Sequence, residues 1–215
     1  MIGIHRYDLA TFPFPDALAE MLGVDDLTAL QAEAGSKPDG SIYKVMEHDP
    51  LYRNLRTALL DERSERFRGL YHRFVAEVIR PLFEEPIHYQ ACPTVRLLFR
   101  ETSGEARFHR DADYGHALEE VNFWVPLTSA AGTNSIWIES APGHGDHAPV
   151  EMGPGEFLAF DGASLSHGAA ANDTGRSRVS FDFRAIAQSR SAKRQLIDRG
   201  PPERLDAHLF TSLDR

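Results

Sequence analysis

The sequence predicts a mainly β domain, an antiparallel sandwich or jelly roll, with helices packed on one outer face. After residue 90 the chain consists of short runs rich in Val, Ile, Phe and Trp, broken by Gly, Pro, Asn and Asp. No predicted helix of any length separates these runs, so successive strands are expected to pair antiparallel. The runs are TVRLLFR, EVNFWVPL, NSIWIE, EFLAF and RVSFDFRAI.

The first 90 residues have the spacing of helices. From Asp49 and Pro50, a good N-cap and first-turn pair, to about residue 84, apolar residues recur mostly at three or four positions and once at eight. They are Leu55, Leu59, Phe67, Leu70, Phe74 and Val78. The stretch DDLTALQAEAG (25–35) predicts another helix, closed by Gly35. We interpret EHDP (47–50) as helix capping rather than a ligand cluster.

We expect a single domain over residues 1–215. A chain of this length builds one full core and is short for two. Residues 1–90 form its mostly helical part, residues 91–188 its β core, and residues 189–215 a short helical tail.

Composition limits the classes of function. The N-terminus lacks a secretory signal and no apolar run approaches a membrane span, so we expect a cytoplasmic protein without membrane contact. Cys92 is the only cysteine, which excludes an internal disulfide and a cysteine-based zinc site. The net charge of −9 argues against a nucleic-acid partner and favours a cationic or neutral small molecule. Nothing in the sequence indicates the oligomeric state.

The stretch FHRDADYGH (108–116) concentrates possible metal ligands. His109 and Asp111 are two positions apart, so on an extended segment their side chains point to the same face. His167 follows the strand EFLAF, 58 residues downstream of His109. Two histidines and one carboxylate with open coordination positions are typical of non-haem Fe(II) sites.

The last predicted strand carries a polar face. Arg178, Ser180, Asp182 and Arg184 alternate with apolar residues, and Arg178 follows His167 by eleven positions. Guanidinium binds carboxylate through charge-assisted bidentate bonds, so Arg178 and Ser180 predict a receptor for a dicarboxylate. Arg176 competes for this role. We prefer Arg178 because Arg176 lies at the start of the strand, where a side chain is more easily solvated.

These residues resemble a known superfamily. FHRDADYGH, together with HG…NDTGRSRVSFDFR, is similar to the His-x-Asp…His and Arg-x-Ser pattern of iron(II)/2-oxoglutarate-dependent dioxygenases. The stretch HRDADYGHALEEVNFWVPLT…GTNSIWIES…FDGASLSHG resembles more narrowly the oxygenases of aminocyclitol antibiotic clusters, of the streptomycin and hygromycin types. The resemblance covers roughly residues 94–186.

The resemblance implies a double-stranded β-helix of the cupin type. It implies Fe(II) held by His109, Asp111 and His167, with 2-oxoglutarate and O2 at the open positions. The far carboxylate of 2-oxoglutarate would bind Arg178 and Ser180. The cosubstrate would be converted to succinate and CO2 while a substrate carbon is oxidised.

Neighbouring residues have a functional and a structural interpretation. Asn122 contacts the cosubstrate carboxylate or satisfies a buried backbone group. Candidate substrate contacts are Asp113, Tyr114, His116, Trp137 and Glu139, with Trp124, Glu119 and Glu120 nearby. Asp113, Tyr114 and His116 would otherwise hold their loop, and Trp137 would be core. His144 and His147 lie in a Gly/Pro-rich loop that suggests a lid rather than a second metal site.

We therefore expect an oxygenase that acts on a small polar, sugar-like substrate, an aminocyclitol or a cationic aminoglycoside. Hydroxylation, desaturation, epimerisation and oxidative ring closure of the orthoester type remain open. The alternatives are a cupin-type sugar isomerase or epimerase, which has no need of the Arg178 and Ser180 pair, and a sugar-binding jelly roll, which has no need of the metal ligands.

Overall fold

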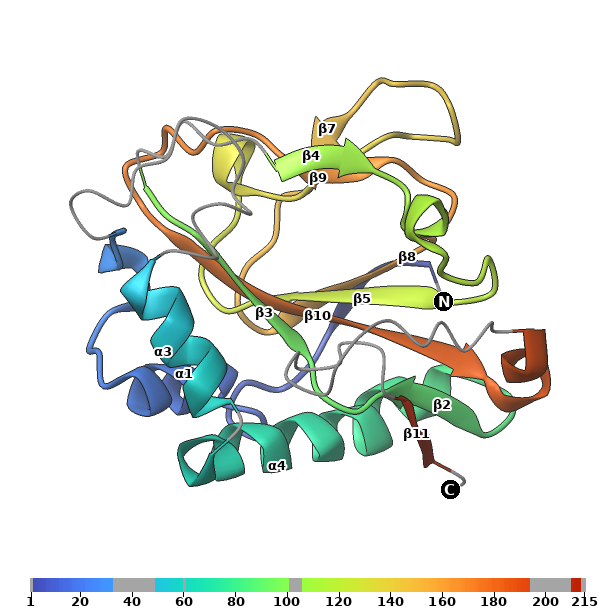
Figure 1. The fold of residues 1–215 in the computed structure, drawn as a ribbon, viewed down its shortest axis with the longest axis horizontal. Helices are drawn as coiled ribbons and strands as arrows, with labels where there is room; N and C mark the ends of the chain where they lie inside the picture. Colours follow the sequence, from blue (N-terminus) through green and yellow to red (C-terminus); the bar gives the residue numbers. More distant parts are fainter. Residues whose placement is uncertain (1, 33–48, 60, 101–105, 194–209, 214–215) are drawn as a thin grey trace.

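The computed structural model describes residues 2–32, 49–59, 61–100, 106–193 and 210–213, and it has three layers. Helices cover one face of a large sheet, and a small sheet lies over its other face (Figure 1). The predicted arrangement of an antiparallel β core with helices on one outer face is confirmed.

In the part of the chain that the structure describes, the large sheet has seven strands, all paired antiparallel. Its order is β1 (Gly3–Arg6), β8 (Glu156–Phe160), β5 (Val121–Pro126), β10 (Arg178–Ala187), β2 (Ile87–Gln90) and β11 (Phe210–Leu213), and β3 (Thr94–Leu98) also pairs with β10. The small sheet runs β4 (Ala106–His109), β9 (His167–Ala169), β6 (Trp137–Ile138) and β7 (Ala148–Pro149). β10 is thus central, with β5 on one side and β3 and β2 on the other.

Among the described residues, three helices form the outer layer: α1 (Phe14–Leu22), α3 (Pro50–Ala58) and α4 (Glu65–Phe74). α4 continues through a π turn, Val75–Ile79, and a 3-10 turn, Arg80–Leu82. Asp49 caps α3 as predicted, since its carboxylate accepts the N–H groups of Leu51 and Tyr52. The helical stretch is interrupted before α4, where a short 3-10 turn, Glu62–Ser64, is capped by Asp61. This break coincides with the eight-residue gap in the apolar pattern.

The expected helix over 25–35 is reduced to a 3-10 turn, Leu27–Ala29, and Leu30 after it is extended. Ser177, just before β10, explains the difference, because its N–H donates to the Thr28 carbonyl and its hydroxyl to the Leu30 carbonyl. Tertiary hydrogen bonds therefore override the local helical preference. Residues 33–48, with Gly35 and the first two residues of EHDP, lie outside the described residues.

The two ends of the chain add strands that the sequence did not predict. β1 pairs with β8 at one edge of the large sheet, and β11 pairs with β2 at the other. The tail therefore differs from the expected helical one: a 3-10 helix, Gln188–Lys193, is followed by residues outside the description and then by a strand.

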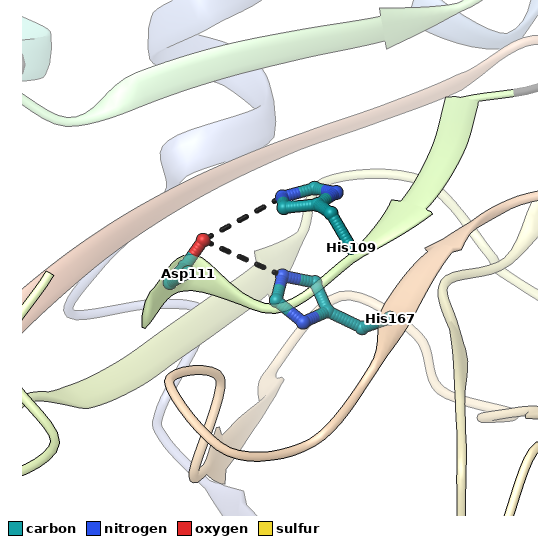
Figure 2. A group of neighbouring side chains, drawn as sticks. All are labelled: His109, Asp111 and His167. Carbon is teal, nitrogen blue, oxygen red and sulfur yellow. Dashed lines mark ion pairs between the residues drawn. The ribbon is translucent and has the colours of Figure 1, made fainter. Parts of the chain in front are cut away.

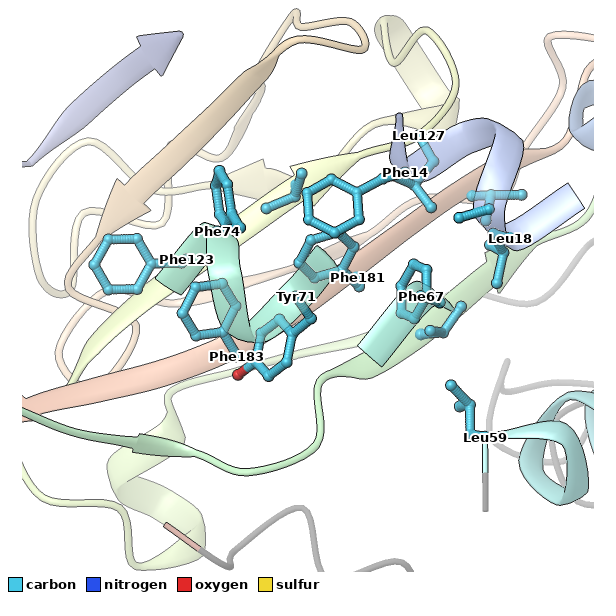
Figure 3. Packing of buried hydrophobic residues seen from close by; sticks show 14 of the residues in the cluster. Phe14, Leu18, Leu59, Phe67, Tyr71, Phe74, Phe123, Leu127, Phe181 and Phe183 are labelled. Atoms are coloured by element: carbon cyan, nitrogen blue, oxygen red, sulfur yellow. The ribbon is translucent and has the colours of Figure 1, made fainter. Parts of the chain in front are cut away.

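Alternation along β10 separates the core from the polar interior. Phe181 and Phe183 point toward the helices and pack on Phe14, Phe67 and Tyr71 with ring centroids 4.9–6.2 Å apart (Figure 3). All five side chains are buried, and each such burial contributes about 2–3 kcal/mol. Because successive side chains point to opposite faces, the intervening polar residues of β10 face the small sheet.

Candidate metal centre

The two histidines come from neighbouring strands of the small sheet. His109 is the last residue of β4, His167 is the first residue of β9, and the two are register partners. Asp111 opens a 3-10 turn, Asp111–Tyr114, directly after β4. The turn ends at Gly115, whose φ of 86° lies in the left-handed region that glycine adopts most easily. The structure therefore brings the three predicted ligands together.

Figure 2 shows both imidazole rings directed at the Asp111 carboxylate. Oδ1 of Asp111 lies 3.5 Å from Nε2 of His109 and 3.8 Å from Nε2 of His167. Ligand atoms that share one cation at about 2.1 Å each lie at most about 4.2 Å apart, so both pairs meet this requirement. Within the described ranges, no other group of three His, Cys, Asp or Glu side chains is arranged to hold a metal.

Both histidines are oriented through their other ring nitrogen. Nδ1 of His109 lies 2.9 Å from the Arg107 carbonyl, and Nδ1 of His167 lies 2.9 Å from the Leu165 carbonyl. A carbonyl only accepts, so each Nδ1 carries a proton, and Nε2 is the nitrogen of the neutral ring that has a lone pair for a metal. Hydrogen bonds of this kind fix the tautomer and ring orientation of metal-binding histidines.

The second oxygen of the Asp111 carboxylate is held by the large sheet. Oδ2 accepts from Nδ2 of Asn122 at 2.6 Å and from Nε of Arg184 at 2.8 Å, and Nη2 of Arg184 also lies 2.8 Å away. Asp111, Asn122 and Arg184 are all buried. Burial alone would raise the pKa of Asp111, but His109, Arg184, His167 and Asn122 outweigh it and hold that pKa well below its usual range.

Gly162 packs against Asn122 and bonds the backbone of Asp111. Its carbonyl accepts the N–H of Asp111 at 2.9 Å. A Cβ at Gly162 would come within 2.3 Å of Nδ2 of Asn122, so no other residue fits without moving that amide. Glycine here allows the backbone to approach the Asn122 side chain closely.

The predicted cosubstrate residues lie next to each other on β10, facing the small sheet. Nη1 of Arg178 donates to the Ser180 hydroxyl at 2.8 Å, and Nε donates to the Asn134 carbonyl at 3.0 Å. The guanidinium stands 5.6 Å from the centre of the Trp124 ring. Burial lowers the pKa of Arg178 to about 10. No carboxylate among the described residues forms a salt bridge with Arg178. Arg176, the competing candidate, is exposed, whereas Arg178 is buried.

Three of the residues predicted to contact substrate lie in the segment after Asp111. Tyr114 is exposed, and its ring meets His109 edge-on with centroids 5.2 Å apart. Asp113 is exposed and forms an ion pair with Arg110 at 3.0 Å. His116 is half-buried, and its Nδ1 lies 2.8 Å from Glu120, which is itself buried. Only Tyr114 combines exposure with contact to a metal ligand.

The remaining predicted substrate residues are engaged within the protein. Nε1 of Trp137 donates to the Gly132 carbonyl at 3.1 Å. Glu139 is buried, and its carboxylate accepts the N–H of Ser166 at 2.7 Å and that of Gly145 at 3.0 Å. Trp124 is also buried, in a cluster between the two sheets, and it supports Arg178 instead of offering a surface for a sugar ring.

The loop between β6 and β7 forms a hydrogen bond to Ser166, the residue before His167. Nε2 of His147 lies 2.9 Å from the Ser166 hydroxyl, and the His147 ring packs on Phe108 with centroids 4.3 Å apart. His144 lies 3.3 Å from the Ser140 hydroxyl. This loop contacts the segment that carries one metal ligand.

Comparison with known proteins identifies the family. The streptomycin biosynthesis protein StrG of Streptomyces griseus is 35% identical over 208 residues, which cover 96% of each chain. The chain belongs to the StrG family. No protein-family model matches the sequence.

Several solved structures share the fold of this StrG-family chain. The non-haem monooxygenase ThoJ, in a nickel complex, has a TM-score of 0.55 at 16% identity over 86% of this chain and 74% of its own. CytC3 with Fe(II) and α-ketoglutarate has a TM-score of 0.51 at 12% identity over 86% and 72%. EctD from S. alaskensis, with 2-oxoglutarate and 5-hydroxyectoine, has a TM-score of 0.52 at 16% identity over 87% and 73%. These similarities confirm the predicted fold.

Two residues around the metal centre could not be predicted from the sequence. Arg184 shares a face of β10 with Arg178, a pattern visible in the sequence, but its partner Asp111 is 73 residues away. Gly162 gave no signal, because only the fold brings it to Asn122.

Among the residues that the structure describes, no helix is both long and apolar enough to span a bilayer.

Proposed function

We propose that the chain is an Fe(II)/2-oxoglutarate-dependent oxygenase that uses O2. The observation that carries the proposal is the pairing of His109, Asp111 and His167 with a buried guanidinium, Arg178, on the facing sheet. A metal triad alone fits many reactions. A triad beside a buried cation that has no carboxylate partner among the described residues fits a reaction whose cosubstrate is an anion.

The donor set fits iron. Two imidazole nitrogens with free lone pairs and one carboxylate oxygen suit Fe(II) and leave positions open for other ligands. Bound iron supplies the chemistry that couples conversion of 2-oxoglutarate and O2 to succinate and CO2 with oxidation of a substrate carbon. His109, Asp111 and His167 would hold and orient the metal.

Arg178 and Ser180 are the proposed receptor for the far carboxylate of 2-oxoglutarate. A guanidinium taken out of water without a counterion is costly, and a carboxylate that binds it recovers charge-assisted hydrogen bonds. Two of its N–H groups are already fixed by Ser180 and Asn134, so the fork is oriented before the ligand arrives. Nδ2 of Asn122 donates to Asp111, so Asn122 would influence cosubstrate binding by holding that metal ligand.

The proposed substrate is a small polar, sugar-like molecule, an aminocyclitol or aminoglycoside, oxidised by hydroxylation or by ring closure of the orthoester type. Membership of the StrG family, whose named relative belongs to streptomycin biosynthesis, supports this class. Tyr114, exposed beside His109, is the side chain best placed to contact such a substrate. Of the acidic candidates, Asp113 and Glu119 are not buried, whereas Glu120 and Glu139 are.

Turnover tests the proposal. The protein with Fe(II), 2-oxoglutarate and a panel of aminocyclitols, aminoglycosides and neutral sugars should form succinate in proportion to oxidised product, and the His167→Ala variant should form none. Binding of a cationic substrate should weaken with added salt, because partly exposed ion pairs are screened within about 8–10 Å. Product formation without consumption of 2-oxoglutarate would favour a cupin-type isomerase instead.

A further inference from the structure

Arg184 is the residue of β10 that the proposed function does not yet use. Its side chain is 9% exposed, and its guanidinium faces a single oxygen, Oδ2 of Asp111, through both Nε and Nη2 at 2.8 Å. No other ion pair of Arg184 is present among the described residues. A buried arginine devoted to one oxygen of a metal ligand acts on that ligand rather than on substrate.

Counting lone pairs shows what this contact does. A carboxylate oxygen offers about two acceptor sites. On Oδ2 these sites are taken by Nδ2 of Asn122 at 2.6 Å and by Nε of Arg184. Oδ1 is the oxygen that faces Nε2 of both histidines. The two oxygens of the carboxylate therefore have different contacts. Oδ2 is held by the large sheet, and Oδ1 is directed at the metal position.

We propose that Arg184, with Asn122, is a positioning residue that limits Asp111 to binding iron through Oδ1 alone. The proposal rests on the proposed function for the identity of the metal. A carboxylate free to turn can offer both oxygens to one cation, which fills a coordination position. Holding Oδ2 away keeps that position open for 2-oxoglutarate or O2.

The sign of one measurement separates this role from simple electrostatics. A cation near a metal site repels the metal, so removing a guanidinium that acts only through its charge should strengthen metal binding. Removing one that orients a ligand should weaken binding, by about 10- to 100-fold for residues that support metal ligands. Arg96 provides the matched control, because it faces the same interior from β3 but pairs with Asp182 at 2.8 Å.

The experiment is calorimetric titration of metal-free Arg184→Met, Arg184→Lys and Arg96→Met with Ni(II), followed by 2-oxoglutarate at saturating Ni(II). We expect Arg184→Met to lose about 10- to 100-fold in Ni(II) affinity. Arg184→Lys should recover part of the loss, and Arg96→Met should bind Ni(II) at least as tightly as wild type. At saturating metal, Arg184→Met should also bind 2-oxoglutarate more weakly, since Asp111 competes for a position.

Unchanged or tighter Ni(II) binding by Arg184→Met would overturn the proposal. Thermal unfolding of each variant checks the fold, and if Arg184→Met does not fold, Arg184→Lys and Asn122→Ala must show the loss instead. Titration requires no turnover. Suppose that the wild-type protein binds Ni(II) but, when loaded with Fe(II), never consumes 2-oxoglutarate with any substrate. That result would refute the proposed function and leave the role of Arg184 testable.

Discussion

His109 and His167 face each other as register partners on the antiparallel strands β4 and β9, with ring centroids 4.7 Å apart. The pairing explains how ligands 58 residues apart in sequence share one metal position. A shift by one residue would turn either imidazole to the other face of the small sheet. Strand register therefore sets the geometry of two of the three ligands.

Asp111→Ala should destabilise the metal-free protein as well as abolish tight metal binding. The substitution leaves the Arg184 guanidinium buried without its carboxylate, and breaking a buried pair from one side costs about 3–5 kcal/mol. Urea denaturation in the presence of a chelator measures the free energy of unfolding. The double variant Asp111→Ala/Arg184→Met should recover much of the loss. Equal stability of the single and double variants would show that the pair is not coupled.

Gly162→Ala should weaken metal binding while the chain still folds. The added Cβ would stand 2.3 Å from Nδ2 of Asn122, so the amide must move away from Asp111. Such overpacking costs about 1–3 kcal/mol. Gly153→Ala is the control, because a Cβ there meets nothing within 4 Å. Ni(II) titration and thermal unfolding of both variants check this, and equal metal affinity in the two would refute it.

Arg178→Lys should reduce 2-oxoglutarate affinity and leave metal affinity unchanged. Lysine keeps the charge but loses the planar fork, and loss of a charge-assisted hydrogen bond costs about 1–3 kcal/mol. Arg176→Lys, at an exposed position two residues earlier, should have no effect. Titration of each Ni(II)-loaded variant with 2-oxoglutarate measures the difference. A larger loss in Arg176→Lys would move the anchor to that residue.

Glu139 should contribute to the acid sensitivity of the fold. Hydrogen bonds from the N–H groups of Ser166 and Gly145 lower its pKa from 4.5 to about 2. A carboxylate with a depressed folded pKa adds stability that is present above about pH 4.5 and is lost as pH falls through about 2. Glu139→Gln should flatten this part of the stability profile, whereas Glu151→Gln, at an exposed carboxylate, should not. Identical profiles for wild type and Glu139→Gln would contradict the assignment.

The sequence predicted the parts of the structure that depend on local patterns. Short runs rich in β-branched and aromatic residues located β5, β8 and β10, and Asp49 with Pro50 located the start of α3. The spacing of His109, Asp111 and His167 predicted a metal site because few other functions require those residue types.

The remaining features depend on contacts between distant segments. β1 and β11 are strands because the sheet edges offer backbone partners, and the short runs around them give little periodic signal. The buried environments of Glu139 and Glu120 were also invisible, since exposure of a carboxylate depends on what packs over it. Of the acidic residues named as substrate candidates or their neighbours, only Asp113 and Glu119 are therefore not buried.

Anaerobic titration of the metal-free protein with Fe(II), followed by 2-oxoglutarate, measures both steps on which the proposed function depends. We expect Fe(II) to bind at one site, 2-oxoglutarate to bind tightly only after Fe(II), and Asp111→Ala to abolish both steps. Arg178→Lys should weaken only the second step. Tight Fe(II) binding by Asp111→Ala, or 2-oxoglutarate binding that ignores the metal, would contradict the assignment of His109, Asp111 and His167 as the iron site.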